Sequence, residues 1–258
     1  MIEGVALHSG VHSRVRIHRE EGALRFRRGR QEITASLASV VATPRCTVLG
    51  AAAARVALVE HLLAALHIAN WWHGLVIEVD AEELPILDGS AQAWLEFLPS
   101  LGDPPPPPAP LSLLNALHYQ DDHDPACRLQ LLPGEAALCV AVDYPHPAIG
   151  AQRWCGQPRD YTELAAARTF GFRAELEAMR AHNLAKGASL DNVLAFDAEA
   201  ACSPLRYPDE VARHKALDVL GDFFLLNRPL QARLEVQRGS HRAHIACLRQ
   251  LSEQERLL

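Results

Sequence analysis

The sequence predicts an α+β protein with two similar domains, and three observations support this. Each half begins with segments that alternate polar and apolar residues, as strands do. Each half then continues with segments that have the apolar spacing of helices. Between them, LGDPPPPPAP (101–110) contains five successive prolines, which favour a stiff, extended segment. We expect a first domain over residues 1–103, a linker over 104–110 and a second domain over 111–258, each a sheet covered on one face by helices.

The expected elements follow in chain order. In the first domain, strands are predicted at RVRIHRE (14–20) and GLVIEVDAE (74–82), and a helix at VALVEHLLAALHIA (56–69). In the second domain, the predicted strands are RLQLL (128–132), ALCVAVDY (137–144) and RLEVQRG (233–239), and the predicted helices are AELEAMRAHNLA (174–185) and DEVARHKALDVLGDFFLL (209–226). The run Pro104–Pro108 is interpreted as a linker rather than as a docking motif for a proline-binding module.

Composition narrows the class of protein. The chain has 258 residues, 49% of them apolar, and a formal charge of −6, so it can fill large cores and offers no basic stripe for nucleic acid. The N-terminus lacks a basic, apolar leader, and no run approaches the ~18 apolar residues of a membrane-spanning helix, so we expect a soluble cytoplasmic protein. The sequence leaves the oligomeric state open, and a monomer is the expectation. Six cysteines without a C-x-x-C pair predict reduced thiols and no cysteine zinc site.

The helix expected from Asp209 carries a row of polar residues. His214, Asp218 and Asp222 follow one another at intervals of four and therefore share a face. An imidazole and a carboxylate one turn apart can bind the same divalent cation. A single pair of this kind is more often a solvated surface pair, and a catalytic zinc site needs a third protein ligand.

The candidate for that third ligand lies on the first domain's helix. Glu60 and His61 are adjacent in an apolar stretch, where both are costly to bury without partners. If it is considered alone, His61 is best interpreted as a core or boundary histidine whose ring is hydrogen-bonded. Taken with His214 and Asp218, it completes a two-histidine, one-carboxylate set at the domain interface, with Glu60 beside it to accept a proton.

Seven motifs follow one another along nearly the whole chain. They are GVALHSG (4–10), VEHLLAAL (59–66), ELPILDGSA (83–91), HPAIGAQRW (146–154), ARTFGF (167–172), NLAKGASLDN (183–192) and LRYPDEVARHKALDVLGD (205–222). Any one is modest evidence, but their common order is highly specific. In this order they resemble the motifs of the UDP-3-O-acyl-N-acetylglucosamine deacetylases (LpxC) of lipid A synthesis.

The resemblance implies the fold and the roles of individual residues. It implies two domains whose helix layers are sandwiched between the sheets, with the active site at their interface. It implies zinc bound by His61, His214 and Asp218, Glu60 as the base for the attacking water, and His241 as a charged group that stabilises the oxyanion and protonates the amine. Asp222 orients His241, and Thr169 donates to the oxyanion. Phe170 contacts the sugar, Lys215 meets the polar part of the substrate, and Arg238 contacts phosphate. An apolar wall for the acyl chain is formed by Leu176, Ala185 and Leu190. Lys215 is expected to point away from the metal.

Some of these residues have simpler interpretations, and the chain departs from the family at others. Without the motif order, His241 would be interpreted as part of a solvated basic turn, and Thr169 as a strand or turn hydroxyl that bonds to the backbone. Lys215 would be interpreted as a surface charge and Phe170 as a core residue. The first domain is shorter than usual, Ala42 replaces an aspartate, Lys186 stands at an apolar position of the acyl channel, and Ser240 replaces a glycine.

Three functions therefore remain open from the sequence. The first is zinc-dependent removal of acetate from UDP-3-O-acyl-N-acetylglucosamine. The second is deacetylation of another N-acetylated amino sugar or small amide, and the third is a non-catalytic zinc-binding regulatory protein.

Overall fold

A computed structural model of the chain describes residues 1–255, and its two main sheets share one strand order. The first sheet runs β1 (Ile2–Val5), β2 (His12–Ala23), β8 (His73–Val79), β3 (Arg25–Arg28), β4 (Gln31–Thr34). The second runs β10 (Leu117–Gln120), β11 (Arg128–Pro133), β16 (Leu230–Gln237), β12 (Ala137–Tyr144), β13 (Gly150–Gly156), and the short strand β9 (Leu111–Ser112) also pairs with β16, in parallel. Along the shared five-strand order each sheet has one parallel pair, β3 with β8 and β12 with β16, among otherwise antiparallel neighbours, which confirms the predicted α+β class with two similar halves.

Each half carries an insert between its fourth strand and the helix that precedes its central strand. The first insert is a small sheet, and the second is a parallel strand pair with a short helix. The first insert comprises β5 (Val40–Ala42), β6 (Val48–Ala51) and β7 (Ala54–Ala57); the second comprises β14 (Phe170–Phe172), α3 (Leu176–Ala181) and β15 (Leu194–Phe196). Short 3-10 turns occupy Leu37–Ser39, Leu98–Leu101, Pro158–Leu164, Arg173–Glu175 and Phe224–Leu226.

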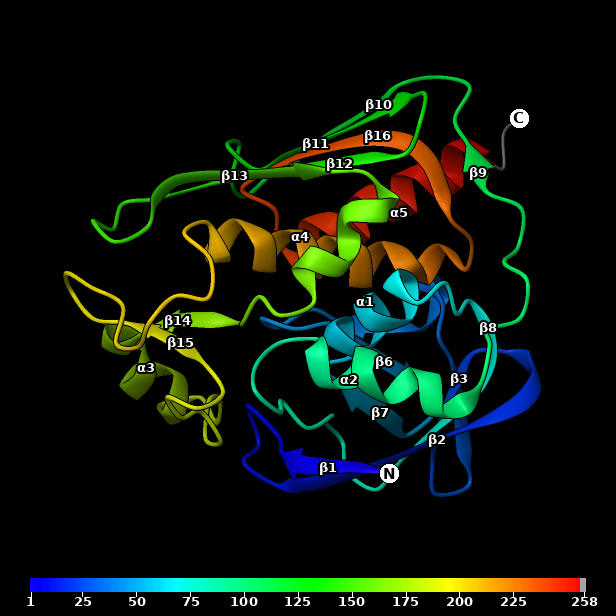
Figure 1. The fold of residues 1–258 in the computed structure, drawn as a ribbon, viewed down its shortest axis with the longest axis horizontal. Helices are drawn as coiled ribbons and strands as arrows, with labels where there is room; N and C mark the ends of the chain where they lie inside the picture. Colours follow the sequence, from blue (N-terminus) through cyan, green and yellow to red (C-terminus); the bar gives the residue numbers. More distant parts are fainter. Residues whose placement is uncertain (256–258) are drawn as a thin grey trace.

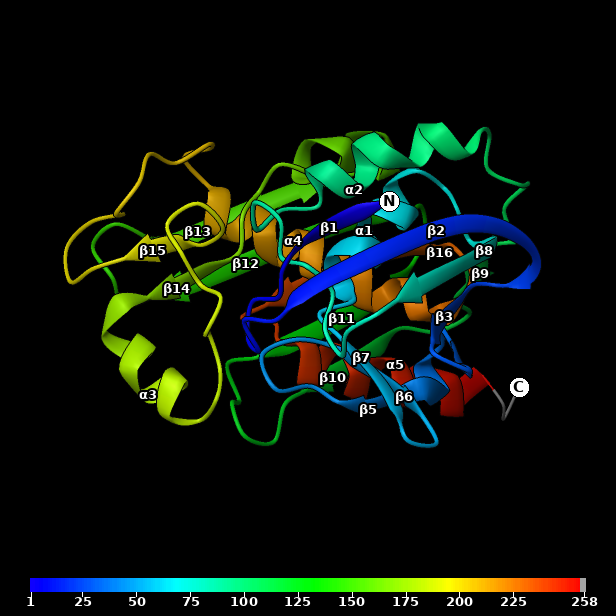
Figure 2. The same ribbon diagram turned by 90° about the horizontal axis from the view of Figure 1, so that it is seen from below.

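The helices α1 (Glu60–Ile68), α4 (Glu210–Phe223) and α5 (His241–Glu255) lie between the two sheets, as Figures 1 and 2 show. The short helix α2 (Gln92–Phe97) packs beside α1. Helix α1 is buried from Glu60 to Leu66, because neighbours cover it on every side. No helix over residues 1–255 is both long and apolar enough to cross a membrane.

The backbones of α1 and α4 approach closely at Gly221. A Cβ atom at this position would lie 2.1 Å from the carbonyl oxygen of Glu60, which is far inside van der Waals contact. Only glycine fits there, so the close crossing brings the polar residues of the two helices together.

The predicted helices differ from the observed ones at their ends. The helix expected over 56–69 begins at Glu60, because residues 54–57 form an edge strand of the first insert. The helix expected over 174–185 is confined to Leu176–Ala181. Helices α2 and α5 were not predicted; α5 begins at His241, which the sequence alone placed in a basic turn.

The proline run is an extended segment held against the first half. The side chain of His73 contacts the carbonyl oxygen of Pro106 through Nε2 at 3.1 Å, and Arg19 donates to the carbonyl oxygen of Asp103 at 3.1 Å. These contacts tether both the start and the middle of the segment.

The expectation that all cysteines are reduced thiols is wrong for one pair. Cys139 and Cys155 are direct cross-strand neighbours on β12 and β13, with Cα atoms 4.1 Å apart, and they form a disulfide. Spacing along the chain could not reveal this pair, because the strand register decides it. Free cysteines remain at positions 46, 127, 202 and 247.

Candidate active site

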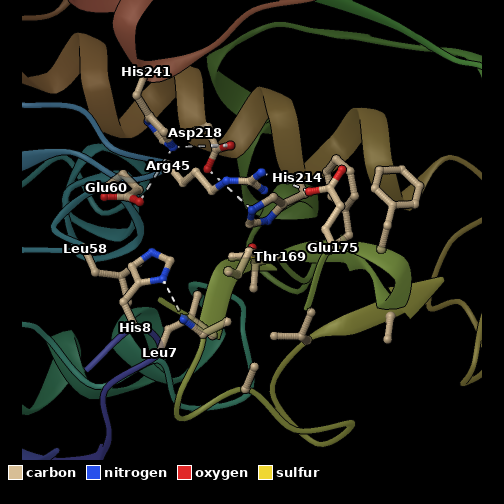
Figure 3. A pocket seen from close by; sticks show the side chains of 18 of the residues that line it. Leu7, His8, Arg45, Leu58, Glu60, Thr169, Glu175, His214, Asp218 and His241 are labelled. Atoms are coloured by element: carbon tan, nitrogen blue, oxygen red, sulfur yellow. Dashed lines mark hydrogen bonds and ion pairs between the residues drawn. The ribbon is translucent and has the colours of Figure 1, made fainter. Parts of the chain in front are cut away.

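A cavity of about 780 Å³ lies where the two halves meet. Figure 3 shows that Glu60, His214, Asp218 and His241 gather on one side of it, while Leu7, His8 and Leu58 come from the first half below them. The lining combines residues of α1 and α4 with the second insert and the start of α5. The cavity therefore requires both halves of the chain.

His61, His214 and Asp218 form a compact buried group. Their ligand atoms lie within 4.8 Å of one another, and each side chain is at least 95% buried. The Oδ1 atom of Asp218 lies 3.4 Å from Nε2 of His214 and 4.0 Å from Nε2 of His61. The tertiary structure thus brings together, from two separate helices, the three side chains that the sequence analysis expected to bind a metal.

The chemistry of this group fits a metal cation. Asp218 Oδ1 is buried without a hydrogen-bond partner, which is costly unless a cation satisfies it. Burial lowers the pKa of His61 to about 3 and also lowers that of His214, so both imidazoles are neutral, as ligation requires. Nδ1 of His214 donates to the carbonyl oxygen of Ala167 at 3.1 Å, which leaves Nε2 free to ligate.

Glu60 lies beside this group at the start of α1. Its Oε2 atom accepts the backbone N–H of Thr47 at 3.0 Å, and its Oε1 atom lies 3.7 Å from Nε2 of His241. Burial, assisted by the nearby carboxylates Asp222 and Asp218, raises the pKa of Glu60 to about 7. A carboxylate with such a pKa can accept and release a proton near neutral pH.

His241 and Asp222 form a buried pair on the other side of Glu60. Nδ1 of His241 donates to Oδ2 of Asp222 at 2.8 Å. Although burial alone lowers the pKa of His241, the carboxylates of Asp222, Glu60 and Asp218 raise it to about 10. Burial alone raises the pKa of Asp222, but the charge of His241 and its hydrogen bond lower it to about 2. The pair is therefore a carboxylate and an imidazolium, and the imidazolium's Nε2 faces Glu60 and Asp218.

Thr169 and Phe170 line the same cavity. The backbone of Thr169 is fixed on both sides: its N–H donates to the carbonyl oxygen of Gly89 at 2.7 Å, and its carbonyl accepts the N–H of Leu194 at 2.8 Å. Gly89 adopts φ = +86°, and a Cβ there would lie 2.3 Å from the carbonyl oxygen of Asn192, so the DGSA stretch needs glycine at this close contact.

The expectation that Lys215 points away from the metal group is wrong. Its Nζ atom lies 2.9 Å from Oδ2 of Asp218 and 5.7 Å from the centre of the Phe170 ring. The physical reason is the i,i+3 spacing, which places Lys215 and Asp218 on neighbouring turns of α4. The ammonium group therefore neutralises Asp218 from the cavity side.

The predicted channel residues differ in where they lie. Leu176, Ala185 and Leu190 all line the cavity, whereas Lys186 and Arg238 are not among its lining residues. The side chain of Arg238 instead donates to the carbonyl oxygen of Asp143 at 3.1 Å, and Arg242, four residues later, lines the cavity.

Ser240 stands where the family has a glycine, which tolerates unusual backbone angles, but the backbone at Ser240 is not strained. Ser240 is not among the described residues with positive φ; Arg238 is, at φ = 52°. The Oγ atom of Ser240 accepts the backbone N–H of Ala243 at 3.3 Å, which is the N-cap interaction that serine favours. Ser240 therefore helps to start α5 at His241.

Sequence reasoning missed four residues around the cavity. Arg45 and Glu175 form a 2.9 Å ion pair between the first and second inserts, and both line the cavity. His8 lines it with a buried, unpartnered Nε2 atom. His244 donates through Nδ1 to Oδ2 of Asp222 at 2.7 Å. The motif GVALHSG was a signal for His8; the others have partners too distant in sequence to be recognised.

Two similar α+β halves enclose a buried group of two histidines and one aspartate that could hold a metal ion, beside a glutamate and an imidazolium. This arrangement is typical of hydrolases whose active site lies between two domains.

Comparison with known proteins places the chain within that class. A family profile described as LpxC, UDP-3-O-acyl N-acetylglycosamine deacetylase, matches residues 1–253. Proteins named UDP-3-O-acyl-N-acetylglucosamine deacetylase are 38% identical in Thermosynechococcus vestitus (88% of this chain, 80% of the relative), 35% in Nitratidesulfovibrio vulgaris (97% and 84%) and 36% in Synechocystis sp. (98% and 95%). The chain belongs to the LpxC family.

Proposed function

We propose that this protein is a zinc-dependent deacetylase that hydrolyses the acetamide of UDP-3-O-acyl-N-acetylglucosamine in lipid A synthesis. The observation that carries the proposal is the arrangement of His61, His214 and Asp218 beside Glu60 and His241, buried at the head of one cavity. Family membership and the names of the relatives point to the same reaction.

Zinc fits the three ligands, because two imidazoles and one carboxylate are a donor set of catalytic zinc sites. When bound, zinc supplies a Lewis acid for the acetamide and lowers the pKa of a water molecule to ~7. Lys215 and the Ala167 carbonyl hold Asp218 and His214 in their orientations.

Glu60 is the proposed general base. Its carboxylate takes a proton from the attacking water, and its pKa of about 7 suits this task near neutral pH. The N–H of Thr47 fixes the Oε2 atom, so the Oε1 atom is the one that faces His241 and the cavity.

His241 and Thr169 are proposed to stabilise the negative charge that develops on the amide oxygen. His241 remains charged because Asp222 accepts its Nδ1 proton, and its Nε2 proton is then available for the leaving amine. Thr169 faces the same cavity from the second insert.

The rest of the cavity suits an acylated sugar. Leu176, Ala185 and Leu190 form an apolar wall for an acyl chain. Phe170 and Lys215 line the same cavity next to the proposed metal ligands, with the Phe170 ring 6.2 Å from that of His214 and Nζ of Lys215 2.9 Å from Asp218. Arg242 replaces Arg238 as the proposed phosphate contact, because it lines the cavity.

The decisive experiment is a deacetylation assay on UDP-3-O-acyl-N-acetylglucosamine with chelated and zinc-reconstituted protein side by side. We expect turnover to vanish with chelator and to return with zinc. Matched substrates lacking either the UDP or the acyl group separate this proposal from action on another amino sugar. Equal turnover on N-acetylglucosamine lacking both groups would show that the proposed substrate is wrong.

The two other functions have less support. Lys186, at an apolar position of the family's acyl channel, suggested a different substrate, but it does not line the cavity. A non-catalytic role predicts the loss of Glu60, Thr169 or His241, and all three are present in the cavity. We also propose the boundaries 1–103, 104–110 and 111–258, since each main sheet is built from one side of the proline segment.

A further inference from the structure

Thr47 forms hydrogen bonds with both the proposed base, Glu60, and the carboxylate that pairs with His241, Asp222. It lies immediately before β6, is fully buried, and belongs to the first insert. Its backbone N–H donates to Oε2 of Glu60 at 3.0 Å, and its hydroxyl donates to Oδ1 of Asp222 on α4. Its carbonyl oxygen accepts the N–H of Val59, which directly precedes Glu60.

The carboxylate of Asp222 depends on this hydroxyl in a specific way. Its Oδ2 atom accepts two imidazole donors, from His241 at 2.8 Å and from His244 at 2.7 Å. Its Oδ1 atom has Thr47 as its hydrogen-bond partner and no other among residues 1–255. Removing the hydroxyl would leave a buried carboxylate oxygen unsatisfied and free the carboxylate to rotate away from His241.

We propose that Thr47 is a positioning residue that couples the base to the acid: its backbone holds Glu60, and its hydroxyl holds the Asp222–His241 pair. Thr47 itself does not line the cavity, so it acts through these two partners. The inference rests on the proposed deacetylase function, in which Glu60 and His241 act on the same amide.

Two substitutions separate the hydroxyl from the shape of the side chain. Thr47→Val keeps the backbone N–H and nearly the same volume but removes the hydroxyl, whereas Thr47→Ser keeps the hydroxyl and removes a methyl group. Loss of an outer-shell hydrogen bond around a metal site typically costs ~10–100-fold in metal affinity or activity. We expect Thr47→Val to lower kcat ~10–100-fold with KM within ~3-fold and the zinc content unchanged, and Thr47→Ser to stay within ~3-fold of the wild type.

A double-mutant cycle tests whether the effect passes through Asp222. In an Asp222→Asn background, the additional Thr47→Val change should cost less than ~3-fold, because its partner is already altered. The proposal is overturned by a wild-type kcat in Thr47→Val, by equal losses in the Val and Ser variants, or by a full loss that persists in the Asp222→Asn background. If Thr47→Val does not fold, Thr47→Ala carries the same comparison with Thr47→Ser.

A spectroscopic measurement keeps this inference separate from the proposed reaction. In ¹⁵N-labelled zinc-loaded protein, the Nδ1 proton of His241, shared with Asp222, gives a downfield resonance. It should shift or broaden in Thr47→Val and remain in Thr47→Ser, and an unchanged resonance in both variants would contradict the coupling. Absence of turnover by the wild type would instead count against the deacetylase function and leave this result standing.

Discussion

Helix α1 in the first half and helix α4 in the second occupy the same place, each just before the central strand of its sheet. Their sequences differ in polar content: α1 contributes Glu60 and His61 to the site, while α4 contributes His214, Asp218 and Asp222. The comparison teaches that a repeated topology supplies the scaffold, and that unlike residues at matching places create the candidate site. Neither helix alone holds all three of the proposed metal ligands.

The inserts differ in the same manner. The first insert, with Thr47 next to β6, fixes polar groups at the head of the cavity, whereas the second insert provides the apolar wall that includes Leu176. Arg45 and Glu175 join the two inserts. In the proposed mechanism, the first insert therefore orients the reacting groups, and the second insert accommodates the substrate.

The largest expected effects come from removing either a proposed metal ligand of α4 or the proposed base of α1. Asp218→Ala should lose both bound zinc and activity, because it removes a ligand, whereas Glu60→Ala should retain zinc and lose ~10²–10⁴-fold in kcat. Metal analysis of the purified variants and steady-state rates check this prediction. Glu82→Ala, an exposed carboxylate in the first half, is the matched control and should behave as the wild type. High activity in Glu60→Ala would refute its role as base.

A smaller effect is expected from the disulfide, which lies on a strand pair that has a counterpart in the other sheet. The pair β12 and β13 carries the Cys139–Cys155 disulfide, whereas the corresponding pair β3 and β4 carries the Arg27–Glu32 ion pair at 2.7 Å. The disulfide closes a loop with a sequence separation of 16, so replacing both cysteines with serine should lower the free energy of unfolding by about 3 kcal/mol.

Urea denaturation with and without reductant measures this contribution. Reductant should destabilise the wild type and leave the double-serine variant unchanged. Arg27→Gln, altered on the other sheet, should respond to reductant as the wild type does. Insensitivity of the wild type to reductant would show that the two thiols are not bonded in solution.

Disturbing the close crossing of α1 and α4 should lower the free energy of unfolding by about 1–3 kcal/mol. Gly221→Ala places a methyl group against the Glu60 carbonyl oxygen, and such overpacking typically costs this much free energy of unfolding. Gly171→Ala is the control, since its Cβ would meet its nearest neighbour at an ordinary 3.9 Å. Thermal denaturation of both variants checks the prediction, and equal stabilities would indicate that the helices separate without cost.

The last prediction concerns the pH dependence of the metal-free protein. The pKa of folded His241, about 10, lies above the ordinary 6.5, so the folded protein binds more protons between these values. The stabilisation from this residue is fully present below pH 6.5 and is lost as pH rises through 10. The difference in unfolding free energy between the wild type and His241→Gln should therefore shrink from pH 6.5 upward, and a constant difference would contradict the raised pKa.

Local patterns were sufficient for much of the fold. Alternation in residues 137–144 predicted β12 with its observed ends, and helical spacing after Asp209 predicted α4, because each pattern depends on neighbours within a few residues. Helix α5 was missed because the first turn after Gln237 has the charged composition of a loop, and its burial between the sheets outweighs that composition.

The sequence by itself determined which residues are proposed to carry the chemistry: Glu60, His61, His214, Asp218 and His241 were named from spacing and motif order, and the structure places all five in one cavity. The tertiary structure alone decided how they are paired. The contacts of Thr47 with Asp222, of Cys139 with Cys155 and of Arg45 with Glu175 join residues far apart in the chain or set by strand register. Such contacts depend on packing and register, which act only after the chain has folded, so no local pattern records them.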